Sequence, residues 1–134
     1  MNTLKMILKI ILRVIAVVII CYLLLVGYLI LGPAVKSLLN RKSFNSQEWK
    51  SHTNERNPVK LNMVDDLLSS HQLVGMSKKE VEELLGKPPV TGYFKEYDYV
   101  YWLGPERGAF GIDSEWLGIK FKDGNVIKIE ILRD

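Results

Sequence analysis

The sequence lacks the residue combinations from which most small active sites are built. Its 134 residues include one cysteine and two histidines, so no disulfide can form within the chain and no cluster has the spacing of a metal site. A phosphate-binding glycine loop that ends in Lys-Ser or Lys-Thr and a G-x-S-x-G nucleophile motif are also missing. We expect His52 and His71 to be structural or solvated. The chain is therefore predicted not to be an enzyme and to use no metal or cofactor.

Acidic residues are missing from the first 35 positions, and this absence locates the positive charge of the protein. That stretch holds 27 apolar residues and three basic ones, Lys5, Lys9 and Arg13. Residues 36–134 carry 15 basic and 15 acidic side chains, so the formal net charge of +3 belongs to the N-terminal piece. Because no basic domain underlies the net charge, the composition excludes a nucleic-acid-binding protein.

The 22 residues between Arg13 and Lys36 carry no charge and are long enough to cross a membrane. A helix rises about 1.5 Å per residue, and the hydrocarbon core is about 30 Å thick. A cleaved signal peptide has a shorter apolar run that ends in small residues, which does not fit the exit at 31–35. We predict a basic flank over 1–13 and an uncleaved single-pass transmembrane helix over 14–35, with the lipid bilayer as a partner. Basic residues flank the helix on both sides, so charge leaves its orientation open.

Residues 36–60 are polar, rich in Asn and Ser, and keep no helical or strand period for long. We expect a juxtamembrane linker here, with a short interfacial turn around Phe44 and Trp49. Six basic and two acidic residues give this segment a charge of +4, whereas residues 61–134, with nine basic and 13 acidic residues, have a charge of −4. The pattern predicts an acidic domain on a basic stalk.

Two helices are expected at the start of the domain over 61–134. Residues 61–76 place four apolar side chains on one helical face, those of Leu61, Val64, Leu67 and Leu68. The second helix, over 77–85, begins with an S-x-x-E capping box, in which Ser77 and Glu80 each satisfy a backbone amide of the other. Gly86 and Pro88 end this helix, and Val81, Leu84 and Leu85 form its apolar stripe.

Three strands are expected after Gly92. Residues 93–103 place Tyr97, Tyr99 and Tyr101 on one face, with Val100 and Trp102 on the other. Residues 115–122 alternate again, and Asp123-Gly124 is the signal of a two-residue hairpin. Residues 125–132 then return with Ile127, Ile129 and Ile131 inward. The predicted fold class is α+β: a transmembrane helix, then a small α-α-β-β-β domain whose three-stranded antiparallel meander has one face under the helices.

This order of elements comes with a recognisable motif. The run over 74–88 resembles the G-M-[ST]-x-x-x-V-x-x-x-L-G-x-P signature of the SmpA/OmlA (BamE-like) family, through Gly75, Met76, Ser77, Gly86 and Pro88. Tyr101-Trp102 and the run over 117–126, with Asp123 and Gly124, resemble later parts of the family pattern. The resemblance covers about 61–134 and implies a fold shared with β-lactamase inhibitory protein, an extracytoplasmic place, and a role in binding without catalysis. One feature departs from the family: a hydrophobic helix stands where a lipid-bearing cysteine is expected.

Aromatic side chains are the best candidates for a binding surface. They gather on the strands and on the loop over 104–114, and Tyr and Trp are the residues that dominate protein interfaces. Two roles stay open for them, packing under the helices and contact with a partner. The candidate binding residues are Tyr99, Tyr101, Trp102, Arg107, Phe110 and Trp116.

These observations predict a single-pass, membrane-anchored, non-catalytic protein-binding module of the cell envelope, as an assembly or scaffolding accessory. The alternative is an inhibitor-like or ligand-sensing domain that acts on an envelope enzyme or a small ligand. Such an anchor would hold the domain at the cytoplasmic (inner) membrane. We expect the C-terminal domain outside the cytoplasm and an envelope protein as its partner.

Overall fold

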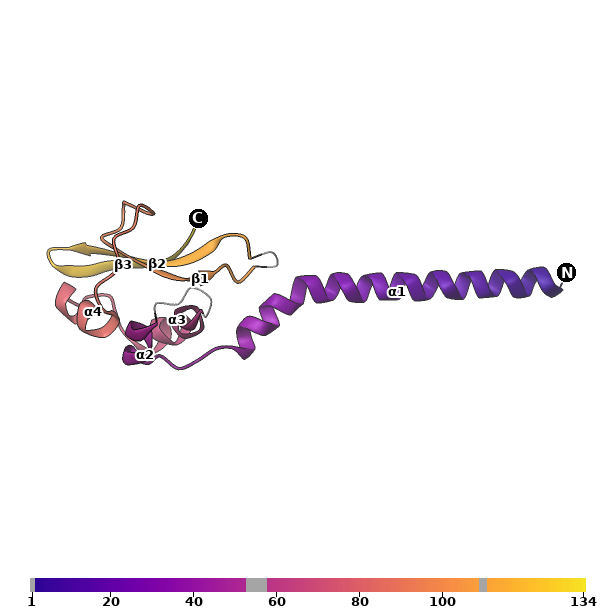
Figure 1. The fold of residues 1–134 in the computed structure, drawn as a ribbon, viewed down its shortest axis with the longest axis horizontal. Helices are drawn as coiled ribbons and strands as arrows, with labels where there is room; N and C mark the ends of the chain where they lie inside the picture. The colour runs from indigo at the N-terminus through magenta and orange to yellow at the C-terminus, as the bar shows by residue number, and fades with distance from the viewer. Residues whose placement is uncertain (1, 53–57, 109–110) are drawn as a thin grey trace.

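The computed structural model describes residues 2–52, 58–108 and 111–134. Its first element is α1 (Asn2–Leu39), a helix of 38 residues of which none is buried in the protein. α1 is long and apolar enough to cross a membrane. Figure 1 shows it as a rod that projects from the rest of the chain and bends near its C-terminal end, the part that contains Pro33. Proline removes a backbone donor and displaces the preceding turn, which accounts for a bend there.

The rest of the chain is an α+β domain of the predicted class. Three short helices, α2 (Ser46–Ser51), α3 (Val59–Ser70) and α4 (Lys78–Leu85), precede three strands, β1 (Tyr99–Pro105), β2 (Ser114–Lys122) and β3 (Asn125–Arg133). The strands form one antiparallel sheet in the order β1-β2-β3. The three helices lie on one side of the sheet, and the loop between α4 and β1 rises on the other side (Figure 1).

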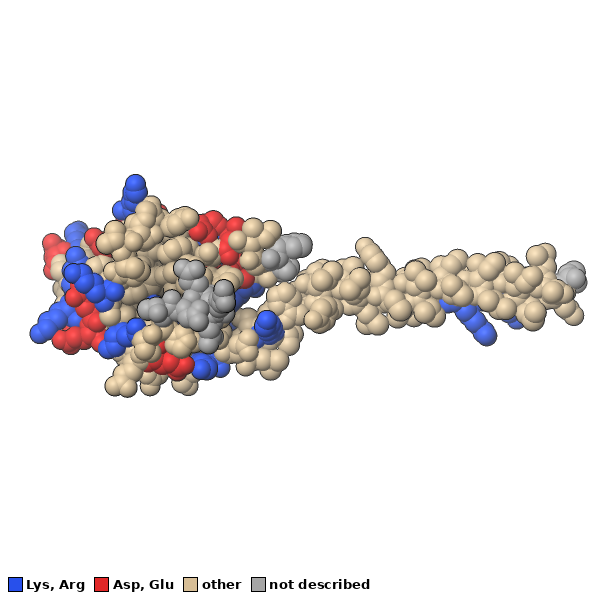
Figure 2. All heavy atoms as spheres, in the orientation of Figure 1, with Lys and Arg blue, Asp and Glu red and all other residues tan. Residues whose placement is uncertain are grey.

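Charge follows this division of the chain. Acidic and basic side chains are scattered over the domain, whereas the surface of α1 is almost free of them (Figure 2). The uncharged part of α1 exposes all of its leucine, isoleucine and valine side chains except Val26, which is half-buried. A soluble protein rarely exposes so large an apolar surface, so this helix needs an apolar surrounding such as lipid.

The core lies between the helices and one face of the sheet. Leu117 and Ile119 of β2 are fully buried there, together with Met63 and Leu67 of α3 and Val81 of α4. Two predicted contacts of α3 turn out differently. Leu68 is 38% exposed, and Met63 takes a core position that the predicted face omitted. Leu68 lies near the exposed C-terminal end of α3, and α2 packs against this helix, so the buried stripe of α3 includes Met63 in place of Leu68.

The segment expected as a linker contributes to this core, which corrects that expectation. Asn45 caps α2 through its side-chain oxygen, which accepts a hydrogen bond from the Glu48 amide at 2.9 Å. Trp49 of α2 is fully buried, and its ring meets those of Phe44 and Tyr101 edge to face at 5.8 and 6.4 Å. A tryptophan placed this way belongs to the domain core, because rings in this geometry add to the area they bury.

The β2–β3 hairpin has the predicted two-residue turn. Asp123 and Gly124 both have positive φ, 53° and 83°, as the turn type favoured in hairpins requires. Next to the turn the register shifts between Lys120 and Phe121. This bulge makes Val126 the inward residue and leaves Ile127 53% exposed, which corrects the expected inward position of Ile127.

The family-like motif joins α4 to this hairpin. The capping box is present, with the Ser77 amide donating to Glu80 Oε2 at 2.7 Å. Just before it, the Gly75 amide donates to the carbonyl of Val126 at 2.9 Å, and the Val126 amide donates to the carbonyl of Met76 at 2.8 Å. Gly75 has φ +94, a conformation that side chains disfavour. The motif therefore aligns the start of α4 with the start of β3.

Candidate binding cleft

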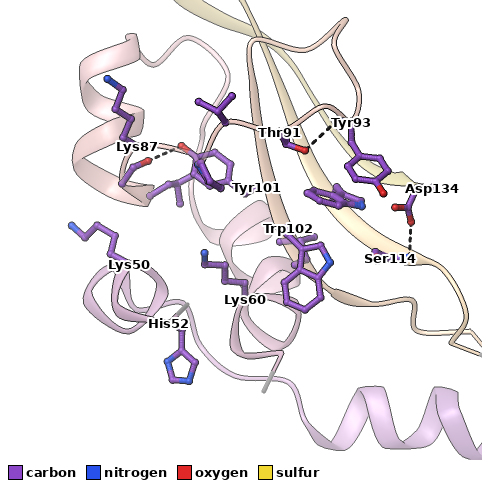
Figure 3. A pocket seen from close by; sticks show the side chains of 16 residues that line it. Lys50, His52, Lys60, Lys87, Thr91, Tyr93, Tyr101, Trp102, Ser114 and Asp134 are labelled. Carbon is purple, nitrogen blue, oxygen red and sulfur yellow. Dashed lines mark hydrogen bonds between the residues drawn. The ribbon is translucent and has the colours of Figure 1, made fainter. Parts of the chain in front are cut away.

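A cleft of about 870 Å³ lies beside β1, the edge strand of the sheet. Its described walls come from Lys50 of α2 and His52 just after it, from Lys60 of α3, from the end of α4 and the loop after it, and from β1 and β2. Figure 3 shows Lys50, His52 and Lys60 on one side, with Trp102, Tyr93 and Ser114 across from them. Helices therefore supply the basic wall and the sheet supplies the aromatic wall.

Lys60 is the cation inside the cleft. Its side chain extends between the helices and Trp102 (Figure 3). Its ammonium lies 5.9 Å from the centre of the Trp49 ring, within the range of a cation–π contact. Burial lowers the pKa of Lys60, because removal of water disfavours the charged form. Among the described residues, no carboxylate forms an ion pair with it.

Trp102 and Trp116 form the aromatic wall, on the face of the sheet that points away from the helices. They are paired across β1 and β2. Trp102 is half-buried, and Trp116 is 9% exposed beneath Tyr93, whose ring centre lies 5.1 Å away. The indole nitrogen of Trp116 is buried without a hydrogen-bond partner among the described residues. An unsatisfied buried donor costs about 1–3 kcal/mol, so this wall is not optimised for stability alone.

Two of the candidate binding residues face the core instead. Tyr99 and Tyr101 are 9% and 2% exposed. The Tyr101 hydroxyl donates to the carbonyl of Gly86 at 2.8 Å, and the Tyr99 hydroxyl donates to Glu82. Burial, and next the hydrogen bond to Glu82, raises the pKa of Tyr99 to about 12. Both tyrosines thus fasten α4 to β1, although the ring of Tyr101 also reaches the cleft (Figure 3).

Tyr97 leaves the face on which the alternation placed it beside Tyr99. β1 begins at Tyr99, and the chain before it turns over the outer face. There the Tyr97 ring covers Gly118, where a Cβ would lie 2.7 Å from it, and its hydroxyl donates to Glu130. Alternation holds only within a regular strand, so it does not extend to residue 97.

Arg107 lies away from the cleft in a network of charges. Its guanidinium contacts Glu115 Oε2 at 2.8 Å and Asp65 Oδ1 at 2.9 Å. Glu115 is fully buried and is the one charged side chain buried among the described residues. Arg107 neutralises this carboxylate and ties the loop after β1 to α3, which is a structural task. Phe110, the remaining candidate, lies outside the described residues.

The structure thus brings Trp102 and Trp116 together at one surface and places Tyr99, Tyr101 and Arg107 in structural contacts. The sequence analysis did not place Lys60 or Tyr93 at a surface cleft, and it expected His52 to be structural or solvated. No local sequence pattern marks a residue that becomes half-buried only through the tertiary fold. Among residues 2–52, 58–108 and 111–134, no group of three or more His, Cys, Asp or Glu could hold a metal ion. The described lining of the cleft is basic on the helix side and aromatic on the sheet side.

Comparison with known proteins identifies the domain. A family model described as the outer membrane protein assembly factor BamE domain matches residues 61–130. The match covers more than half of the 134 residues. It includes α4, β1, β2 and most of α3 and β3, and it leaves α1 and α2 outside. Curated proteins and solved structures give no match.

Proposed function

The chain belongs to the BamE domain family, and we propose that it is a single-pass, membrane-anchored, non-catalytic protein-binding module of the cell envelope, acting as an assembly or scaffolding accessory. One observation carries the proposal: the same chain holds a long apolar helix and, after α2, a BamE domain. The family description names an outer membrane protein assembly factor. This chain has a different means of attachment, so its site of action is proposed separately.

We place α1 in the cytoplasmic membrane and the domain outside the cytoplasm. An apolar helix of this length suits a hydrocarbon core of about 30 Å. The basic residues on both sides of α1 leave its direction open. The placement outside the cytoplasm therefore rests on the family resemblance. A phosphatase fused after Asp134 tests this placement. Phosphatase activity is expected in intact cells. An inactive phosphatase fusion, together with activity of a cytoplasmic reporter fused at the same position, would contradict the placement.

Protein binding is supported by the exposed part of the aromatic wall. Trp102 is half-buried at the cleft, and large aromatic residues at concave surfaces are typical binding anchors. A photo-crosslinking amino acid at Trp102 should capture envelope proteins in intact membranes. The control position is Ile127, 53% exposed on β3 at the other edge of the sheet. No protein captured at either position would argue against a binding module.

The alternative, a ligand-sensing or inhibitor-like domain, is favoured by the size of the cleft. Its volume of about 870 Å³ falls within the range of about 300–1,000 Å³ that is usual for small-molecule sites. A thermal-shift screen of small molecules on the purified chain separates the two functions. A ligand of the folded domain raises the melting temperature by mass action.

A further inference from the structure

The cleft joins a basic wall to an aromatic one, and this combination defines the chemistry of what it can bind. Among the described residues, four basic ones and one acidic one line it: Lys50, His52, Lys60, Lys87 and Asp134. Asp134 Oδ1 accepts a hydrogen bond from the Ser114 amide at 2.7 Å, so this carboxylate is bound at the far side of the cleft. The lysines among the described lining residues carry positive charge.

Lys60 is the strongest attraction for an anion. It is half-buried, it lines the cleft together with Trp102, and its ammonium lies 5.9 Å from the centre of the Trp49 ring. A charge held in partly desolvated surroundings interacts more strongly with an opposite charge than one in bulk water. A carboxylate beside Lys60 would offset the desolvation that lowers the pKa of this residue.

Lys50 and Lys87 add positive charge at the rim of the cleft. Lys50 Nζ donates to the backbone carbonyl of Glu83 at 2.9 Å. A carbonyl carries no net charge, so this contact does not neutralise the ammonium. Lys87 is exposed just past the end of α4. Their side chains point away from the centre of the cleft (Figure 3), so they can meet a ligand that extends past Lys60. This spread of charge fits a chain of residues better than a compact ion.

The backbone of β1 is less suited to bind by adding a strand. β1 is an edge strand, but its register shifts between Trp102 and Gly104 next to the cleft. A bulge of this kind twists an edge and hinders pairing with a further strand. Recognition therefore depends on the side chains of Lys60, Trp102 and Tyr93.

We propose that the cleft binds an extended acidic segment of a protein partner, with a carboxylate at Lys60 and a neighbouring apolar or aromatic side chain against Trp102. The inference rests on the proposed protein-binding function and specifies its ligand. Lys87 and Lys50 would meet carboxylates further along the same segment.

A peptide selection on the full chain in phospholipid nanodiscs tests the proposal. The probe is a phage library of random peptides of about eight residues, which extend over roughly 26 Å. Empty nanodiscs remove lipid binders. Selected sequences should be enriched in Asp and Glu next to an aromatic or aliphatic residue. Selection of neutral or basic sequences, or of none at all, would overturn the proposal.

Variants then locate the binding. For a selected peptide, Lys60→Met should weaken binding about tenfold, which corresponds to about 1.4 kcal/mol. This change keeps an apolar side chain of similar length. Lys87→Gln, at an exposed site that cannot disturb the core, should weaken binding less and reduce its dependence on salt. The control is Lys122→Gln, an exposed lysine at the end of β2 that does not line the cleft. Equal affinities for all three variants would place the peptide elsewhere and refute the inference.

The outcome separates this inference from the function on which it rests. Capture of envelope proteins by the crosslinker at Trp102 and not at the control position Ile127, without acidic peptides in the selection, would preserve the binding module and reject the acidic ligand. No captured protein and no selected peptide would reject both.

Discussion

The burial of Trp49 makes a quantitative prediction about a segment outside the matched family domain. The side chain is fully buried and is packed edge to face against Phe44 and Tyr101. Replacing a buried tryptophan by alanine usually costs about 3–5 kcal/mol, through lost apolar burial and the cavity left behind. A domain of this size has a total stability of roughly 5–10 kcal/mol. Trp49→Ala should therefore remove about half of it.

A second substitution separates packing from hydrogen bonding at this site. The Trp49 indole nitrogen is buried with no hydrogen-bond partner among the described residues. Trp49→Phe keeps an aromatic ring in the core and removes this unsatisfied donor, whose burial costs about 1–3 kcal/mol. The gain offsets part of the lost volume, so we expect Trp49→Phe to cost about 1 kcal/mol or less.

Urea unfolding of the full chain in detergent micelles measures both effects. The fluorescence of Trp102 and Trp116, which all variants retain, reports on the sheet, and linear extrapolation gives the free energy of unfolding. The control is Lys42→Ala, which removes an exposed ion pair of 2.9 Å with Glu48 in the same segment and should cost less than about 1 kcal/mol. An unfolding midpoint for Trp49→Ala equal to that of Lys42→Ala would show that α2 is not part of the core and refute the reasoning.

Three further predictions follow from single contacts. Glu115→Gln should destabilise the domain by about 2 kcal/mol in the same urea assay, because it removes the charge of a buried carboxylate that accepts hydrogen bonds from Arg107. Gly118→Ala should cost about 1–3 kcal/mol, since the new Cβ would lie 2.5 Å from a methyl group of Leu132. The side-chain and backbone hydrogen bonds from Ser77 lower the pKa of Glu80 in the folded protein. The capping box therefore stabilises the fold above the ordinary carboxyl pKa of about 4.5. This stabilisation is lost as the pH falls through the lower pKa that Glu80 has in the folded state. Urea midpoints measured between about pH 7 and pH 3 should fall less steeply for Glu80→Gln than for the natural chain, and parallel curves would contradict this.

Local signals in the sequence account for the parts of the fold that were predicted correctly. Each of these signals lies within one continuous stretch of the sequence. They are the uncharged run before Lys36, the capping box at Ser77 and the turn at Asp123-Gly124. The α+β class with its three-stranded antiparallel sheet followed from these elements and is confirmed by the structure and by the family match.

Features that depend on distant contacts were not predictable in the same way. α2 has six residues, too few for a helical period, and its one strong signal was Asn45 before Glu48. The inward face of β3 changed at the bulge near Ile127, which depends on pairing with β2. Lys60 acquires its place in the cleft because α3 packs against β1. The half-buried lysine and the two tryptophans become one site only through the tertiary fold.

The contacts of residues 41–44 limit how the cleft can be presented at a membrane. The Lys42 amide donates to the Asn62 carbonyl at 2.9 Å, the Phe44 amide donates to Asp66 Oδ2 at 2.6 Å, and Arg41 Nε lies 3.1 Å from Asp65 Oδ2. The chain is thus bound to α3 within two residues of the end of α1 at Leu39. A domain held this way does not move on a free tether, because each of these contacts would have to break first. If α1 spans the bilayer as proposed, the cleft stays close to the membrane surface, and a partner has to present its binding segment there. The basic residues at this junction then serve two purposes, contact with the lipid head groups and attachment of the domain, which explains how the stalk can be basic while the domain it carries is acidic.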